Sequence, residues 1–267
     1  KSVLKARTMI NMDSEDEGVA TVSCAGGLRV QFTKEIQRTT VQGSLLTLKV
    51  EGLLGGHSGQ DIDKERQNAD LLMARMIQRL LKETKGQLVS FNGGTKDNAI
   101  PRECEASLIY ESDEEAAKAE ELACELAETY AEELTPAEPD FSCEISCETN
   151  RTAEAIPQDA AKEFICAMRL APNGIQKRNI KMDGFVVVSL NLGVVRTEED
   201  RIVMIFSPRS SVASLQEDTK ERLNTLAETF GFTVSHSSEY PGWSFKEDSP
   251  VREICKESYK ELYGEDL

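Results

Sequence analysis

Histidine is scarce in this sequence: His57 and His236 are the only two among 267 residues. A site for two zinc ions needs several histidine, aspartate and glutamate ligands. His236 lies in "TVSHSSEYPGW", at the end of a strand-like run, where a structural role is expected. The chain therefore cannot build a complete histidine–carboxylate metal centre from its own residues.

Basic residues and long apolar runs are also in short supply. Lysine and arginine number 31 against 47 acidic residues, which gives a net charge of −16. Because nucleic acids and anionic membranes bind to basic surfaces, this balance argues against both as partners. No apolar run approaches the ~18 residues that a membrane span needs, and no signal peptide is visible. We expect a globular, cytoplasmic protein.

Paired cysteine motifs are absent as well. Seven cysteines are present, an odd number, and no two form a CxxC pair. Disulfide frameworks and zinc sites use even or closely spaced sets of cysteines. We therefore expect reduced cysteines that pack in the core.

The pattern of predicted helices and strands repeats once along the chain. Residues ~61–149 and ~157–236 both predict the order α-β-β-α-β. Antiparallel sheets with helices packed on one face would bury both patterns, and joining the two sheets edge to edge would remove an exposed edge. The expected fold class is α+β.

Local signals give the expected bounds of the elements. Apolar residues at i, i+3, i+4 and i+7 predict a helix over residues ~61–82. Ser112 and Glu115 form a capping box that opens the next helix, Pro157 opens a third, and Gly231 ends a fourth. A last helix begins at "SP" before Val251 and has no strand partner. Strands are predicted in "RTMINM" (7–12), "VATVSC", "SLLTLKVEGL", "QLVSF", "AIPRECEASLIYE", "FSCEISCE", "GFVVVSLNLGVV", "RIVMIFS" and "FTVSH".

The most unusual stretch is "GLLGGHSGQDI", which places His57 between glycines just ahead of a predicted helix. Gly55, Gly56 and Gly59 allow the backbone to turn tightly and to approach a ligand closely. A histidine at that place could hydrogen-bond a carbonyl oxygen or an oxyanion. A histidine that merely fills a turn is an equally good interpretation of the local sequence.

Other positions are candidates, each with a plain structural alternative. Asp13 in "NMDSEDEG" follows a predicted buried strand, a common place for a metal ligand, although a solvated acidic turn fits the local sequence better. Asn98 in "NGGTKDNAIP" could orient a substrate or His57, whereas asparagines in turns usually need no function. Arg209 in "FSPRSS" could bind a carboxylate bidentately, and a surface salt bridge is the stronger alternative. Asn191 in "SLNLGVV" needs a hydrogen-bond partner, but no role is forced.

Taken together, the motifs and their order resemble the bacterial aminoacyl-histidine (Xaa-His, beta-alanyl-histidine) dipeptidases. These are di-zinc exopeptidases within a large superfamily of aminopeptidases and carboxypeptidases. The resemblance runs over essentially the whole chain, and "GGHSG" with its following helix is its most specific mark. The other marks are "INMDSEDEG", "CAGG", "RQNA", "NGGTKDNAIP", "SLNLGVV", "SPRSS" and "YPGW".

The resemblance implies a catalytic α/β domain into which a lid, or dimerisation, domain is inserted. It implies that Asp13 ligates one of two zinc ions. It implies that His57 is the lid histidine that stabilises the tetrahedral intermediate, within its own chain or across a homodimer. Asn98 corresponds to the asparagine that helps to hold a dipeptide substrate, and Arg209 to the arginine that binds the terminal carboxylate of that substrate.

Several motifs of the family are missing from this sequence. The upstream H-x-D motif, the bridging aspartate and the paired glutamates are absent, and the C-terminal histidine of the family lies beyond Leu267. We therefore expect this chain alone to be inactive and to bind zinc weakly or not at all. The chain also begins at Lys1 rather than Met and stops directly after a helical pattern, as a fragment of something longer would.

The expected domains follow from this reading. Residues 1–19 and 239–267 are assigned to segments of the catalytic domain, and residues 20–238 to the lid, with two subunits at about 20–150 and 151–238. An alternative from another functional class is a non-catalytic module for small-molecule binding or dimerisation. Stacked α-β-β-α-β units also serve in such modules, and a fold does not fix a function.

Overall fold

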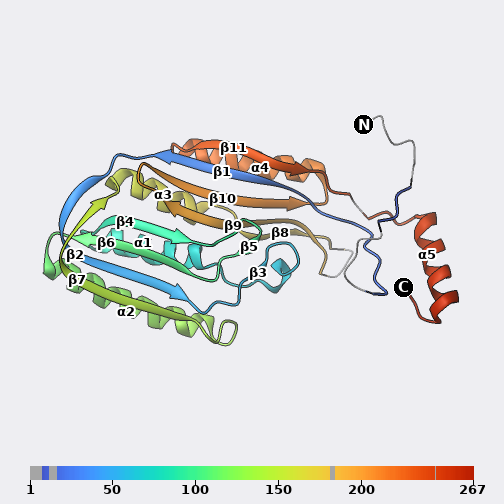
Figure 1. The fold of residues 1–267 in the computed structure, drawn as a ribbon, viewed down its shortest axis with the longest axis horizontal. Helices are drawn as coiled ribbons and strands as arrows, with labels where there is room; N and C mark the ends of the chain where they lie inside the picture. Colours follow the sequence, from blue (N-terminus) through green and yellow to red (C-terminus); the bar gives the residue numbers. More distant parts are fainter. Residues whose placement is uncertain (1–7, 12–16, 181–183, 244) are drawn as a thin grey trace.

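The computed structural model describes residues 8–11, 17–180, 184–243 and 245–267. Four helices cover one face of a long sheet, and a fifth helix lies apart at one end (Figure 1). The helices are α1 (Ala69–Glu83), α2 (Asp113–Leu134), α3 (Gln158–Leu170), α4 (Ala213–Thr229) and α5 (Pro250–Tyr263). The strands are β1 (Gly26–Glu35), β2 (Thr39–Glu51), β3 (Gly56–His57), β4 (Gln87–Gly93), β5 (Ala99–Ile100), β6 (Cys104–Tyr110), β7 (Ser142–Ala155), β8 (Gly174–Arg178), β9 (Val186–Thr197), β10 (Arg201–Ser210) and β11 (Thr233–Tyr240).

The large sheet is antiparallel and is made of two halves joined edge to edge. Its strand order is β11-β1-β10-β9-β4-β6-β2-β7, and β8 pairs with β9. The halves meet where β4 pairs with β9 at Gly93 and Val195. The predicted α+β class, with one antiparallel sheet and helices on one face, is confirmed. Strand β1 pairs with β10 and β11 in one half of the sheet, whereas β2, the next strand in the sequence, pairs with β6 and β7 in the other half. The chain therefore passes from one half to the other between β1 and β2.

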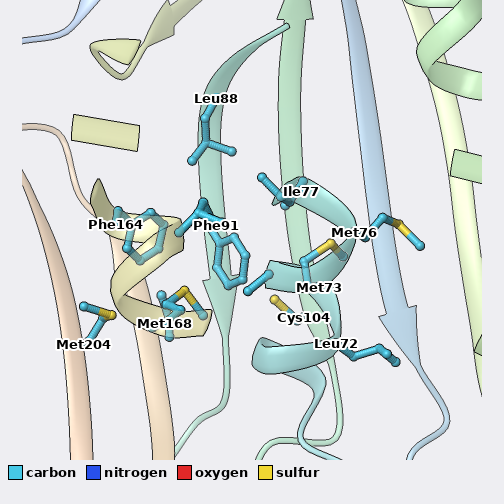
Figure 2. Packing of buried hydrophobic residues seen from close by; sticks show 14 of the residues in the cluster. Leu72, Met73, Met76, Ile77, Leu88, Phe91, Cys104, Phe164, Met168 and Met204 are labelled. Carbon is cyan, nitrogen blue, oxygen red and sulfur yellow. The ribbon is translucent and has the colours of Figure 1, made fainter. Parts of the chain in front are cut away.

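Buried and half-buried side chains alternate along the strands, so the sheet has one face covered by helices and one open face. On β2, Leu46, Leu48 and Val50 are fully buried under the helices, and the residues between them are half-buried. In the centre of the core, Phe91 of β4 lies between side chains of α1 and α3, and its ring meets that of Phe164 edge-on at 5.4 Å (Figure 2). Burial of each such large apolar side chain stabilises the fold by about 1.5–3 kcal/mol. The face opposite α1–α4 is called the open face below.

The helix predicted to begin near residue 61 begins at Ala69 instead. The side chain of Asn68 caps it by accepting the backbone N–H groups of Asp70 and Leu71. The preceding residues cannot join the helix, because the Asp61 carboxylate accepts the backbone N–H of His57 at 2.8 Å. A short 3₁₀ helix, Ile62–Lys64, is all that forms there.

Two predictions for the first strands were wrong. "VATVSC" is not a strand, and only Cys24 makes an isolated bridge, with Trp243. The strand is β1, which was not predicted, although Leu28, Val30 and Phe32 alternate as a half-buried strand requires. For "RTMINM", residues 8–11 are not in a strand, and Arg7 and Met12 lie outside the described residues.

The last helix stands away from the sheet. α5 lies apart from the helices that cover the sheet (Figure 1), and none of its residues is buried. Ile254 and Leu262 expose 60% and 76% of their surface, so much of the apolar surface of α5 is open to solvent. No helix in the described part of the chain is both long and apolar enough to cross a bilayer. The domain bounds given above stay a prediction.

Candidate active site on the open face of the sheet

The turn that carries His57 is held against the segment that carries Asn98. Strand β3 pairs with β5, with His57 opposite Ala99. The backbone N–H of Ser58 donates to the carbonyl oxygen of Asn98 at 2.9 Å. Gly55 and Gly56 adopt φ of 59° and 141°, a region that favours glycine. The glycines therefore set the course of this turn, as the sequence predicted.

The His57 ring has a defined tautomer. Its Nδ1 accepts the backbone N–H groups of Gly59 and Gln60 at 3.2 and 3.1 Å. A ring nitrogen that accepts hydrogen bonds carries no hydrogen, so the neutral ring holds its hydrogen on Nε2. Hydrogen bonds from Lys64 and from the His57 backbone lower the pKa of the Asp61 carboxyl, which stays charged and anchors the turn. The half-buried His57 thus presents an N–H donor from a fixed backbone.

Arg209 reaches the same place from the end of β10. A Cβ atom on Gly59 would stand 3.1 Å from Cε1 of His57 and 3.4 Å from Cζ of Arg209. Arg209 donates from Nη1 to the hydroxyl of Tyr240 at 2.9 Å. Its buried Nε has no hydrogen-bond partner among the described residues. A guanidinium with donors to spare therefore lies beside His57.

Asn98 is exposed, and a buried asparagine holds its segment in place. Asn191 of β9 is only 1% exposed. It donates from Nδ2 to the carbonyl oxygens of Asp97 and Ala99 at 3.3 and 2.8 Å. Gly193 allows this approach, because a Cβ there would lie 2.5 Å from the Asp97 oxygen. Asn191 is thus a positioning residue whose role the sequence left open, and its place in an apolar strand was the signal.

These elements enclose a pocket of about 510 Å³ on the open face. The segment 95–98 forms one wall, Ser238 and Tyr240 form another, and β1 and β10 form the floor. Its charged lining is mostly basic, with Arg29, Lys96, Arg196 and Arg209 against Asp97. His57 does not line this pocket but lies close to Arg209, which does, so the pocket suits a small anionic ligand bound beside His57.

The predicted metal ligand cannot be placed with these residues. Asp13 lies outside the described residues, so its role stays a prediction. Within the described ranges, no three His, Cys, Asp or Glu side chains come together in a way that could hold a metal ion. The described residues therefore do not make a zinc site.

The chain is similar over nearly its whole length to known dipeptidases. The chain is 31% identical over 267 residues to the cytosol non-specific dipeptidase of Escherichia coli (strain K12), covering 98% of this chain and 54% of that protein. The crystal structure of aminoacylhistidine dipeptidase from Vibrio alginolyticus matches with a TM-score of 0.90 and 32% identity, over 99% of this chain and 54% of that one. The chain is a homologue of these dipeptidases.

A family model matches part of the chain. The family model described as "Peptidase dimerisation domain" matches residues 48–138, which hold His57 and Asn98. Arg209 lies outside that match, in the second half of the sheet. The chain spans about half the length of both dipeptidases.

Proposed function

We propose that this segment is the lid of a metal-dependent dipeptidase and supplies the substrate-contacting groups of its active site. The observation that carries the proposal is the convergence of His57, Asn98 and Arg209, which come from three separate parts of the chain. The homology to two dipeptidases gives the class of reaction, the hydrolysis of a short peptide.

Each residue is assigned the role that the resemblance implies, and its position supports that role. His57 donates from Nε2 to the oxygen of the scissile carbonyl as negative charge develops on it. Arg209 binds the terminal carboxylate of the dipeptide, since a guanidinium is the natural bidentate partner of a carboxylate. The exposed amide of Asn98 holds the substrate between them. This part of the molecule thus orients the substrate and stabilises the tetrahedral intermediate.

The tautomer of His57 favours the role of donor over that of metal ligand. A histidine that ligates a metal through one ring nitrogen usually donates the hydrogen of the other to a carboxylate or carbonyl. His57 does the opposite, because its Nδ1 accepts two backbone N–H groups. Removal of His57 should therefore leave the metal content of the enzyme unchanged.

The remaining parts of the proposal rest on the resemblance. Two zinc ions would supply a metal-activated water, with Asp13 as one ligand and the other ligands outside this segment. The substrates would be Xaa-His dipeptides, the enzyme would be cytoplasmic, and this chain alone would be inactive. The dimerisation-domain match supports a homodimer through the lid.

Dipeptide hydrolysis by the full-length protein tests the proposal. His57→Ala should lower kcat by about 10²–10³-fold, the loss expected when one oxyanion donor is removed, with the same bound zinc. His236→Ala is the matched control, because His236 is exposed and its ring bonds only Asn224 among the described residues. Loss of zinc from His57→Ala, or unchanged turnover, would overturn the role assigned to His57.

A further inference from the structure

The pocket holds a second arginine that the roles above do not use. Arg29 lies on β1, two residues beyond Gly27, which pairs with Arg209 of β10. Both arginines alternate with buried apolar residues, so both side chains emerge on the open face. Arg29 and Arg209 therefore lie on neighbouring strands of the same face, and both line the pocket.

Arg29 is only weakly engaged by the protein. Its Nε lies 3.7 Å from Oδ2 of Asp97, and the two side chains remain 39% and 35% exposed. That nitrogen is buried and has no hydrogen-bond partner among the described residues. At this distance the pair is an ion pair without a hydrogen bond. The buried Nε is out of reach of a ligand, but the side chain is 39% exposed and can offer its other guanidinium donors.

The surroundings of Arg29 favour an anion. Lys96 is exposed in the segment 95–98 that lines the pocket. Arg196 also lines the pocket and adds a further positive charge. Its Nη1 donates to the carbonyl oxygens of Gly93 and Val195, both at 2.6 Å. Asp97 is the only acidic residue in the pocket lining. In a chain of net charge −16, this local excess of positive charge attracts anions and repels cations.

We propose that Arg29 is a specificity-determining residue that binds a carboxylate on the side chain of the substrate's C-terminal residue. The inference rests on the proposed function, which places the terminal carboxylate of the dipeptide at Arg209. A side chain that leaves the same α-carbon then extends along the floor toward Arg29. Dipeptides that end in aspartate or glutamate fit this pocket better than those with a neutral side chain of equal size. A histidine side chain binds there in its neutral form, because the basic lining repels a protonated imidazole.

Binding to this chain tests the inference without hydrolysis. Calorimetric titration with Gly-Glu and with Gly-Gln compares two ligands of the same shape that differ by one charge. We expect Gly-Glu to bind about 10-fold more tightly, as a charge-assisted hydrogen bond to Arg29 would give. Arg29→Gln should remove this difference and leave the affinity for Gly-Gln unchanged.

A matched control separates the local effect from the overall charge. Arg75 has the same side-chain exposure, 39%, and pairs with Glu133 on the helix-covered side of the sheet. Arg75→Gln should therefore keep the preference for Gly-Glu. Equal affinities for the two dipeptides, a preference that survives Arg29→Gln, or no measurable binding of Gly-Glu would overturn the inference.

A further variant distinguishes this inference from the proposed function. Arg209→Gln should weaken Gly-Glu and Gly-Gln equally, because both carry the terminal carboxylate. Unchanged affinities in Arg209→Gln would contradict the role proposed for Arg209. A preference for Gly-Glu that still depends on Arg29 would support the anion site by itself.

Discussion

His57 and Arg209 both lie beside Gly59, although His57 comes from the two-stranded sheet β3-β5 and Arg209 from the large sheet. The Cε1 atom of His57 and the Cζ atom of Arg209 are 3.1 and 3.4 Å from the point where a Cβ on that glycine would stand. The turn after β3 thus brings a neutral N–H donor and a guanidinium to one place. Each of the predictions below tests a contact that maintains this arrangement or the fold beneath it.

Gly59→Ala should reduce activity without unfolding the protein. The added methyl group is too close to His57, which must move by a few tenths of an ångström. Since a displacement of 1 Å costs about 10²-fold in rate, we expect kcat of the full-length protein to fall by about 10-fold. The urea midpoint of this chain should stay near that of the parent. An unchanged kcat would show that the position of His57 is not critical.

Asn191→Ala should lower stability, whereas Asn98→Ala should weaken substrate binding. Asn191→Ala leaves the carbonyl oxygens of Asp97 and Ala99 without their buried donor, so the free energy of unfolding should fall by about 1–3 kcal/mol. Asn98→Ala removes an exposed side chain, so the free energy of unfolding should change by less than about 0.5 kcal/mol. The KM for dipeptides should rise, because Asn98 is proposed to hold the substrate. Urea unfolding and steady-state kinetics measure the two effects. The reverse pattern would contradict these assignments.

Asp70 should make the protein less stable as the pH rises. This first-turn residue of α1 is fully buried, and neither carboxyl oxygen is hydrogen-bonded among the described residues. Burial raises the pKa of Asp70 from 3.8 to about 8, although contact with the Cys104 thiol and the charge of Arg196 act in the opposite direction. Between about pH 4 and pH 8 the folded state keeps a proton that the unfolded state releases. Stability should therefore fall across this window by up to about 1.4 kcal/mol per pH unit.

Asp70→Asn isolates this effect. The neutral amide has the same shape, so the slope of unfolding free energy against pH between 5 and 8 should flatten (the window follows from the raised pKa of Asp70). Asp61 and Glu133 cannot produce the slope, because their pKa values are lowered and they titrate at more acidic pH. A slope that persists in Asp70→Asn would show that Asp70 is ionised in the folded state.

The parts of the fold that were predicted from the sequence are those with strong local signals. The apolar runs of β9 and β10 and the capping box of Ser112 and Glu115 identified their elements. Helix α1 was predicted to begin too early, because the partner of Asp61 is the backbone of His57 and no propensity reveals that contact. Strand β1 was missed although the alternation of its apolar residues with polar ones such as Arg29 is the pattern of a half-buried strand.

The site was predicted only in part for a similar reason. His57, Asn98 and Arg209 were identified one by one, through the resemblance to a family, and local sequence left each of them ambiguous. Their convergence depends on strand pairing between distant segments, such as β1 with β10 and β3 with β5. The roles of Asn191 and Arg29 arise from the same pairings, and no short stretch of sequence shows them.

The tautomer of His57 is the most direct test of the claim that this residue is a hydrogen-bond donor aimed at the substrate. Nitrogen-15 NMR of the labelled chain at neutral pH measures it, and only His236 must be told apart, with His236→Gln as the assignment variant. The account predicts that His57 carries its hydrogen on Nε2 and has an unprotonated Nδ1. A hydrogen on Nδ1 would contradict the account, because Nε2 would then be free to ligate a metal.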